Sequence, residues 1–119
     1  MTTTQASAAD PQHRDKPLTS LACTATDLLI IAQNVGLPMP RSLWVSQLIQ
    51  EAELRFPQDG ASLPAITEWA EHFGAAVTCE PVTLKDDGDE FTYCEAVFTH
   101  DGLRVEVYAF IPAGQTSST

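Results

Sequence analysis

The sequence predicts an α+β domain in which an antiparallel sheet of about five strands carries two helices on one face. Three patterns predict this fold. Apolar residues recur at helical spacing in two segments, they alternate with polar residues in several others, and an Asp-Gly turn separates the last two alternating segments. The predicted order is helix, strand, strand, helix, strand, strand, strand (αββαβββ). Covering one side of the sheet with both helices buries the apolar surfaces of both kinds of element.

The composition limits the classes of protein to which the chain can belong. Its 119 residues make one domain, and 44% of them are hydrophobic, which is enough for a core. There are 16 acidic and 6 basic residues, for a net charge of −10. Because so few cations are present to neutralise phosphates, we expect no direct binding to nucleic acid.

Three features predict a cytoplasmic protein that does not cross a membrane. The longest apolar run, residues 28–32, is far too short to span a bilayer. The chain does not open with a positively charged, apolar leader. Its three cysteines have no disulfide-framework spacing, which fits a reducing compartment.

The two ends of the chain are predicted to lie outside the domain. Residues 1–19 are mostly small and polar, and they bury too little apolar area to offset their ordering entropy, so we expect a flexible N-terminal arm. Residues 113–119 predict a frayed C-terminal tail. The single α+β domain is expected to span residues 20–112.

The first predicted helix runs from about Ser20 to Val35. Its apolar residues recur at steps of three and four, which places them on one face. Gly36 suits the left-handed conformation that ends many helices, Leu37 can make the accompanying hydrophobic contact, and Pro38 prevents continuation. The residues on this face are Leu21, Ala25, Leu28, Ala32 and Val35.

Residues 42–56 are open to two interpretations. Ala52 and Leu54 alternate with charged residues, which is typical of a half-buried strand. We predict two short strands, over 42–48 and 51–56, joined by a tight turn. A single helix is the alternative, because no Gly or Pro marks that turn.

The second predicted helix, residues 62–73, has signals at both ends. Ser62 suits the N-cap position, Pro64 lies in the first turn, and Gly74 stops the helix. Trp69 lies on its apolar stripe, so we expect it to anchor the core. The other members of the stripe are Ile66, Ala70 and Phe73.

Three strands are predicted after this helix, over about 75–82, 91–99 and 103–111. Asp101-Gly102 predicts a two-residue hairpin turn, which pairs residues whose numbers sum to 203. One face of this hairpin is apolar and is expected to contact the helices. Its predicted pairs are Phe98 with Val105, Ala96 with Val107, and Cys94 with Ala109.

The opposite face of the hairpin mixes aromatic and charged residues, as a solvated or partner-binding face does. Under the strand interpretation of residues 42–48, Trp44 points to the same face. The aromatic rings form either an exposed patch or a cluster that packs on itself or under the N-terminal arm. We predict that the partner-binding residues are Trp44, Tyr93, Tyr108, Phe110, Glu95 and Glu106.

We expect no catalytic residue, no metal and no cofactor. His72 beside Glu71 and His100 beside Asp101 could each form a general-base pair, but no nucleophile stands at a recognisable motif, and surface histidines are the favoured interpretation. The acidic turn around Gly88 departs from the calcium-loop pattern, so a solvated turn is favoured over a weak calcium site. That turn contains Asp86, Asp87, Asp89 and Glu90.

The three cysteines, Cys23, Cys79 and Cys94, lack metal-ligand spacing. Cys79 and Cys94 come close together if the strands on either side of the acidic turn pair. We expect buried thiols that act as small hydrophobic groups. The alternative is a redox pair, which predicts a disulfide in oxidised samples.

Several short motifs resemble small uncharacterised proteins of high-GC actinobacteria and their phages or mobile elements. The motifs are Leu37-Pro38-Met39-Pro40, Glu53-Leu54-Arg55-Phe56, Trp69-Ala70-Glu71-His72-Phe73-Gly74-Ala75 and Gly102-Leu103-Arg104-Val105-Glu106-Val107-Tyr108-Ala109. The resemblance spans about residues 28–111. Because those proteins carry no assigned activity, it implies a fold and an origin only.

Two functions from different classes follow. The leading hypothesis is a small acidic, non-catalytic interaction or regulatory module that binds a protein partner through its sheet face. The alternative is a phage-type inhibitor of a host nucleic-acid-binding or defence enzyme, which would act by acidic mimicry of nucleic acid. Mimicry predicts carboxylates in a paired, duplex-like row. A winged-helix reading is disfavoured, because its recognition helix would carry Glu68 and Glu71 and no basic residue.

Overall fold

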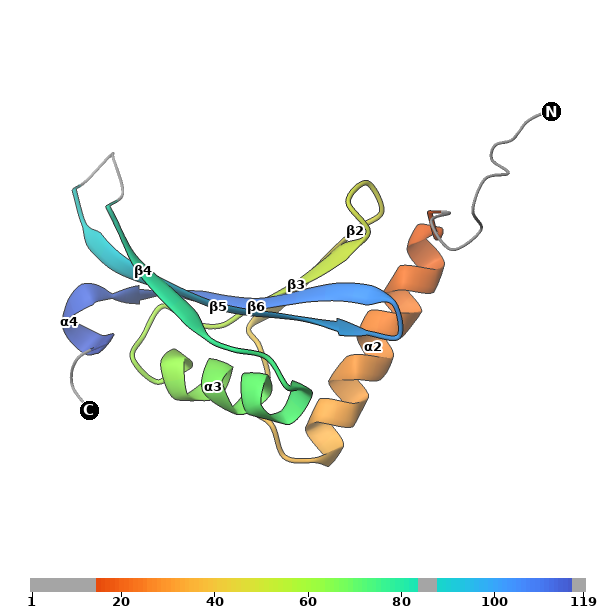
Figure 1. Cartoon of the computed structure of the whole chain (residues 1–119), viewed down its shortest axis with the longest axis horizontal. Coiled ribbons are helices and arrows are strands. Elements are labelled where there is room, and N and C mark those ends of the chain that lie inside the picture. The colour runs from red at the N-terminus through yellow and green to blue at the C-terminus, as the bar shows by residue number, and fades with distance from the viewer. Residues whose placement is uncertain (1–14, 84–87, 117–119) are drawn as a thin grey trace.

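The computed structural model of the chain describes residues 15–83 and 88–116. Within them the predicted α+β class is confirmed, with five strands in one sheet (Figure 1). The chain order adds a short C-terminal helix, α4, that the sequence analysis did not predict. The elements are α2 (Leu18–Asn34), β2 (Ser42–Ser46), β3 (Glu51–Arg55), α3 (Ser62–Phe73), β4 (Thr78–Thr83), β5 (Glu90–His100), β6 (Leu103–Pro112) and α4 (Ala113–Thr116).

The prediction of a purely antiparallel sheet is wrong, because the sheet is mixed. Its strand order is β2-β3-β6-β5-β4, and β3 pairs with β6 in parallel, while the other three pairings are antiparallel. The reason lies in α3, which connects β3 to β4. A helical crossover returns the chain in its starting direction, so β3 and β4 run the same way. β5 is antiparallel to both β4 and β6, which leaves β6 parallel to β4 and therefore to β3.

The strand interpretation of residues 42–56 is confirmed, and the helix alternative is wrong. β2 and β3 form an antiparallel pair that joins Trp44 to Glu53. Their turn also anchors the start of α2. The Gln47 side chain accepts a hydrogen bond from the Leu18 backbone N–H, and Gln50 accepts one from Lys16. These side chains satisfy N–H groups where α2 has no side-chain cap of its own.

The β5–β6 hairpin has the register predicted from its turn. Phe98 pairs with Val105 and Tyr93 with Phe110, so the numbers of paired residues sum to 203 along the whole ladder. Asp101 and Gly102 both have positive φ (48° and 83°), the conformation that a two-residue turn of this kind requires.

Both long helices end as predicted, but α3 begins differently. Gly36 has a φ of 84°, and the Leu37 N–H bonds to the Ala32 carbonyl, which closes α2. α2 begins at Leu18, two residues before its predicted start. Ser62 is not the N-cap of α3, because its hydroxyl donates to the Pro57 carbonyl instead. At the N-terminus of α3, the Asp59 carboxylate accepts a hydrogen bond from the backbone N–H of Ala61, which is the N-cap residue.

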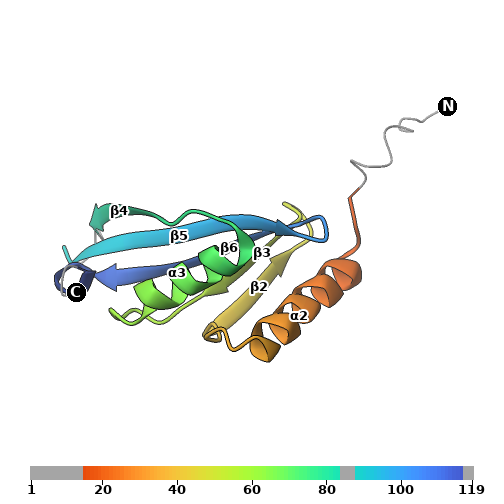
Figure 2. The same cartoon turned by 60° about the horizontal axis from the view of Figure 1, so that its bottom comes forward.

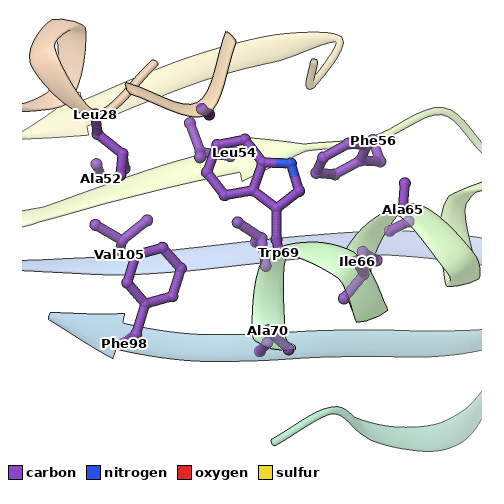
Figure 3. Close-up of a cluster of buried hydrophobic side chains, with 14 of the residues drawn as sticks. Leu28, Ala52, Leu54, Phe56, Ala65, Ile66, Trp69, Ala70, Phe98 and Val105 are labelled. Atoms are coloured by element: carbon purple, nitrogen blue, oxygen red, sulfur yellow. The ribbon is translucent and has the colours of Figure 1, made fainter. Parts of the chain in front are cut away.

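α2 and α3 lie on the same face of the sheet, as predicted (Figures 1 and 2). The core lies between them and the alternating apolar residues of β3, β5 and β6. Trp69 is fully buried at its centre (Figure 3). Its indole N–H donates a hydrogen bond to the Pro38 carbonyl. Within the described residues, no helix has the length and apolar character needed to cross a membrane.

Candidate functional site on the outer sheet face

The outer face is the side of the sheet opposite α2 and α3, and none of the described elements lies over it (Figure 1). Strand alternation and register define its members, because side chains two residues apart share a face. All six predicted partner-binding residues belong to it. The residues of the outer face that concern us are Trp44, Glu51, Glu53, Arg55, Tyr93, Glu95, Arg104, Glu106, Tyr108 and Phe110.

Three aromatic residues of the outer face pack on one another. The centroids of the Tyr93 and Phe110 rings are 5.0 Å apart, and Tyr108 lies 5.9 Å from Tyr93 and 6.3 Å from Phe110. The Arg55 guanidinium stands over the Phe110 ring at 5.9 Å. This ring cluster of Tyr93, Tyr108 and Phe110 is half-buried, so part of each ring is open to a partner.

Trp44 lies on the outer face but apart from the ring cluster. It pairs across β2–β3 with Glu53, and Glu53 pairs with Glu106 of β6. Trp44 is 57% exposed, and among the described residues it makes no ring contact with the cluster. Of the two alternatives for the aromatic residues, the structure has Tyr93, Tyr108 and Phe110 packed on one another, while β3 and its Glu53 lie between Trp44 and β6.

Four carboxylates gather next to the ring cluster. The Tyr93 hydroxyl is within hydrogen-bond distance of both Glu95 (2.9 Å) and Glu106. Carboxylate oxygens of Glu51, Glu53 and Glu106 lie within 4.8 Å of one another. We call Glu51, Glu53, Glu95 and Glu106 the carboxylate cluster.

Two members of the carboxylate cluster, Glu95 and Glu106, have pKa values shifted in opposite directions. Burial, followed by the hydrogen bond that the protonated Glu106 carboxyl group donates to Glu95, raises the pKa of Glu106 to about 7. The same hydrogen bond holds the pKa of Glu95 below its ordinary range. Glu106 therefore keeps a proton at mildly acidic pH while Glu95 is ionised. Burial and the hydrogen bonds to Glu106 and Glu95 raise the pKa of Tyr93, so its hydroxyl stays a donor.

Arg104 is the cation closest to this cluster. Its guanidinium forms an ion pair with Glu51, which is its cross-strand partner on β3 and is 7% exposed. The three carboxylates Glu51, Glu53 and Glu106 could supply oxygens to a divalent cation. Because Glu51 already has a cationic partner, the arrangement gives no reason to assign a metal there.

The sequence pattern placed Arg104 on the outer face of the hairpin, but it did not place Glu51, Glu53 and Arg55 beside it. Their alternation with Ala52 and Leu54 marked a polar strand face, which was the available signal. That signal did not show which strand lies next to β3, because the parallel pairing of β3 with β6 was not predicted.

His72 and His100 lie away from the outer face. His100 is within 3.5 Å of Asp27 on α2 and 3.7 Å of Asp101, at the end of the β5–β6 hairpin. His72 is exposed on α3, with its ring against Phe73. Of the acidic turn, Asp86 and Asp87 lie outside the described residues, so the calcium alternative is not tested.

The described carboxylates are divided between the two sides of the sheet. Four of them form the carboxylate cluster on the outer face, whereas Asp27, Glu68 and Glu71 lie on the helices on the opposite side. Mimicry of nucleic acid, the alternative function, stays a prediction.

Comparisons of the chain with protein-family models, with curated proteins and with solved structures found no match. The resemblance to actinobacterial and phage proteins stays a prediction.

Proposed function

We propose that the protein is a small acidic, non-catalytic interaction module of the cytoplasm, and that its outer sheet face binds a partner protein. The docking segment of that partner carries a lysine or arginine side chain. The observation that carries the proposal is the uncovered carboxylate cluster beside the ring cluster, on a sheet whose other face is filled by both helices.

The chemistry of the outer face favours a cationic ligand. Four carboxylates stand against two arginines, Arg55 and Arg104, and Arg104 is already paired with Glu51. A guanidinium or ammonium group next to Glu106 would displace the proton that this carboxyl group retains, and would gain an ionised partner. The rings of Tyr93, Tyr108 and Phe110 offer flat apolar surface and negative π-faces beside those carboxylates.

The net charge of −10 supports the same class of partner. An acidic protein attracts basic surfaces over long range, which speeds encounter and makes it sensitive to salt. Tyrosine and tryptophan are also enriched among residues that dominate binding energy. Trp44 extends the binding surface across Glu53 to the edge of the sheet.

The test is an NMR titration of the ¹⁵N-labelled full chain with a short arginine-containing peptide. The comparison peptide has each arginine replaced by glutamate. We expect amide shifts of β3, β5 and β6 with the arginine peptide, no shifts with the glutamate peptide, and weaker binding as salt increases.

A matched pair of variants locates the effect. Glu106→Gln keeps the shape of the side chain but removes its charge, and we expect it to weaken peptide binding about tenfold. Glu68→Gln makes the same change on the exposed side of α3 and should leave binding unchanged. Shifts confined to α2 and α3, or equal losses in both variants, would show that the outer face is not the docking surface.

A further inference from the structure

The pairing of β4 with β5 brings two thiols together. Cys79 and Cys94 are directly opposite residues in the antiparallel ladder, and their Sγ atoms are 2.6 Å apart. Opposite residues of antiparallel strands have Cα atoms about 4.5–5.5 Å apart, which falls within the range that a disulfide spans. Bond formation therefore requires little movement of the backbone.

The two thiols differ in accessibility. Cys79 is exposed on β4, whereas Cys94 is buried on β5. Burial, followed by the contact with Cys79, raises the pKa of the Cys94 thiol to about 12. An oxidant in solution thus reaches Cys79 first, and Cys94 is placed behind it as the second thiol.

We propose that Cys79 and Cys94 form a reversible disulfide by exchange with low-molecular-weight disulfides, and that this bond locks β4 to the sheet. The Cys79 thiolate attacks one sulfur of a disulfide RSSR, forms a mixed disulfide and releases RS⁻. The Cys94 thiol then loses its proton to water and attacks Cys79 Sγ, which releases the second RS⁻. Two protein thiols are oxidised to one disulfide, and RSSR is reduced to two thiols.

The disulfide would act on the edge of the sheet, where β4 lies. β4 is the edge strand of the sheet, and its residues are exposed except for the half-buried Val82. Among the described strands β4 pairs only with β5, so a covalent bond across that ladder removes the freedom of β4 to separate. β4 also borders the outer face, because a hollow of about 80 Å³ is lined by Thr78, Cys79, Glu80, Tyr93 and Glu95. The inference is independent of what the outer face binds.

The chain is well suited to a direct test. Trypsin cleaves after Arg55, Lys85 and Arg104, which puts Cys79 and Cys94 on separate peptides, residues 56–85 and 86–104. Cys23 falls on a third. The reduced full chain is incubated with oxidised glutathione, denatured, alkylated and analysed by mass spectrometry without reduction. We expect a loss of two hydrogen atoms, alkylation of Cys23 alone, and a linked pair of the two peptides.

Two variants and a melting measurement complete the test. Cys23→Ser should form the same link, and Cys79→Ser should form none; both sites are exposed, so folding is preserved. Oxidation should raise the Tm of the wild type by roughly 10 °C and leave that of Cys79→Ser unchanged. A stable glutathione adduct on Cys79 with Cys94 free would overturn the pairing. Equal Tm values of the linked and reduced wild type would overturn the locking of β4.

Discussion

The inner and outer faces of the sheet are built from the same strands but differ in burial. Along β6, alternate residues from Leu103 to Ile111 are buried beneath the helices, while Glu106, Tyr108 and Phe110 between them are half-exposed. The period of two in a strand separates these sets completely. Substitutions on the inner face should therefore change stability, and most substitutions on the outer face should change recognition. The predictions below test that separation.

The two tryptophans provide the largest expected difference. Trp69 is fully buried against Phe56 and Phe73, so Trp69→Ala removes a large apolar side chain and leaves a cavity. We expect the free energy of unfolding, measured by urea denaturation, to fall by about 3–5 kcal/mol.

Trp44→Ala is the matched substitution on the outer face. Because Trp44 is mostly exposed, the loss of unfolding free energy should be less than about 1 kcal/mol. Similar losses for both tryptophans would break the distinction between the two faces.

Glu51 and Arg104 are the expected exception on the outer face, because Glu51 is buried and needs its cationic partner. Arg104→Ala should cost about 1–3 kcal/mol of unfolding free energy, since it leaves a buried carboxylate without its ion pair. Adding Glu51→Gln should recover part of the loss. Arg41→Ala, at an exposed residue before β2, should change stability by less than about 0.5 kcal/mol and serves as the control.

The carboxylate cluster predicts a pH dependence of stability. The folded protein holds the Glu106 proton up to about pH 7, whereas the unfolded chain loses it near the ordinary pKa of 4.5. The folded state therefore binds more protons between these pH values, and the free energy of unfolding should decrease as pH rises from about 5 to about 7. Glu95, with its lowered pKa, acts in the opposite direction and only below its ordinary pKa.

Glu106→Gln isolates this effect. Urea denaturation at several pH values should give a smaller decrease between pH 5 and 7 for Glu106→Gln than for the wild type, because contributions common to both proteins cancel. Glu68→Gln on α3 should keep the wild-type slope. An unchanged slope in Glu106→Gln would mean that Glu106 does not hold the proton.

The period of two and the turn residues were enough to predict most of the fold. The Asp101-Gly102 turn alone determined the register of β5 and β6, and so placed Tyr93, Glu95, Tyr108 and Phe110 on one face. Cross-strand proximity of Cys79 and Cys94 followed from the same kind of argument. These features are local, because each depends on a hairpin whose strands are neighbours in sequence.

Long-range pairing was the part that the sequence did not reveal. Nothing in residues 51–55 marks β6 as their neighbour, since the two strands are separated by α3, β4 and β5. The carboxylate cluster depends on that pairing, which brings Glu51 and Glu53 to Glu106. Parallel strands need a long crossover connection, and the helix between β3 and β4 supplies one. A topology with β3 parallel to β4, and so to β6, could therefore have been considered from the sequence.

The central claim is that the outer face recognises a basic partner and that its ring cluster contributes little to stability, and Tyr108 tests this claim most directly. Tyr108 belongs to the ring cluster and is the cross-strand partner of Glu95 in the carboxylate cluster. Burial, followed by the charge of Glu53, raises the pKa of Tyr108. The measurement is the affinity of Tyr108→Ala for the arginine peptide, together with its unfolding free energy. We predict a loss of about tenfold in affinity with a change of no more than about 1 kcal/mol in stability. Unchanged affinity in a variant that stays folded would contradict the account.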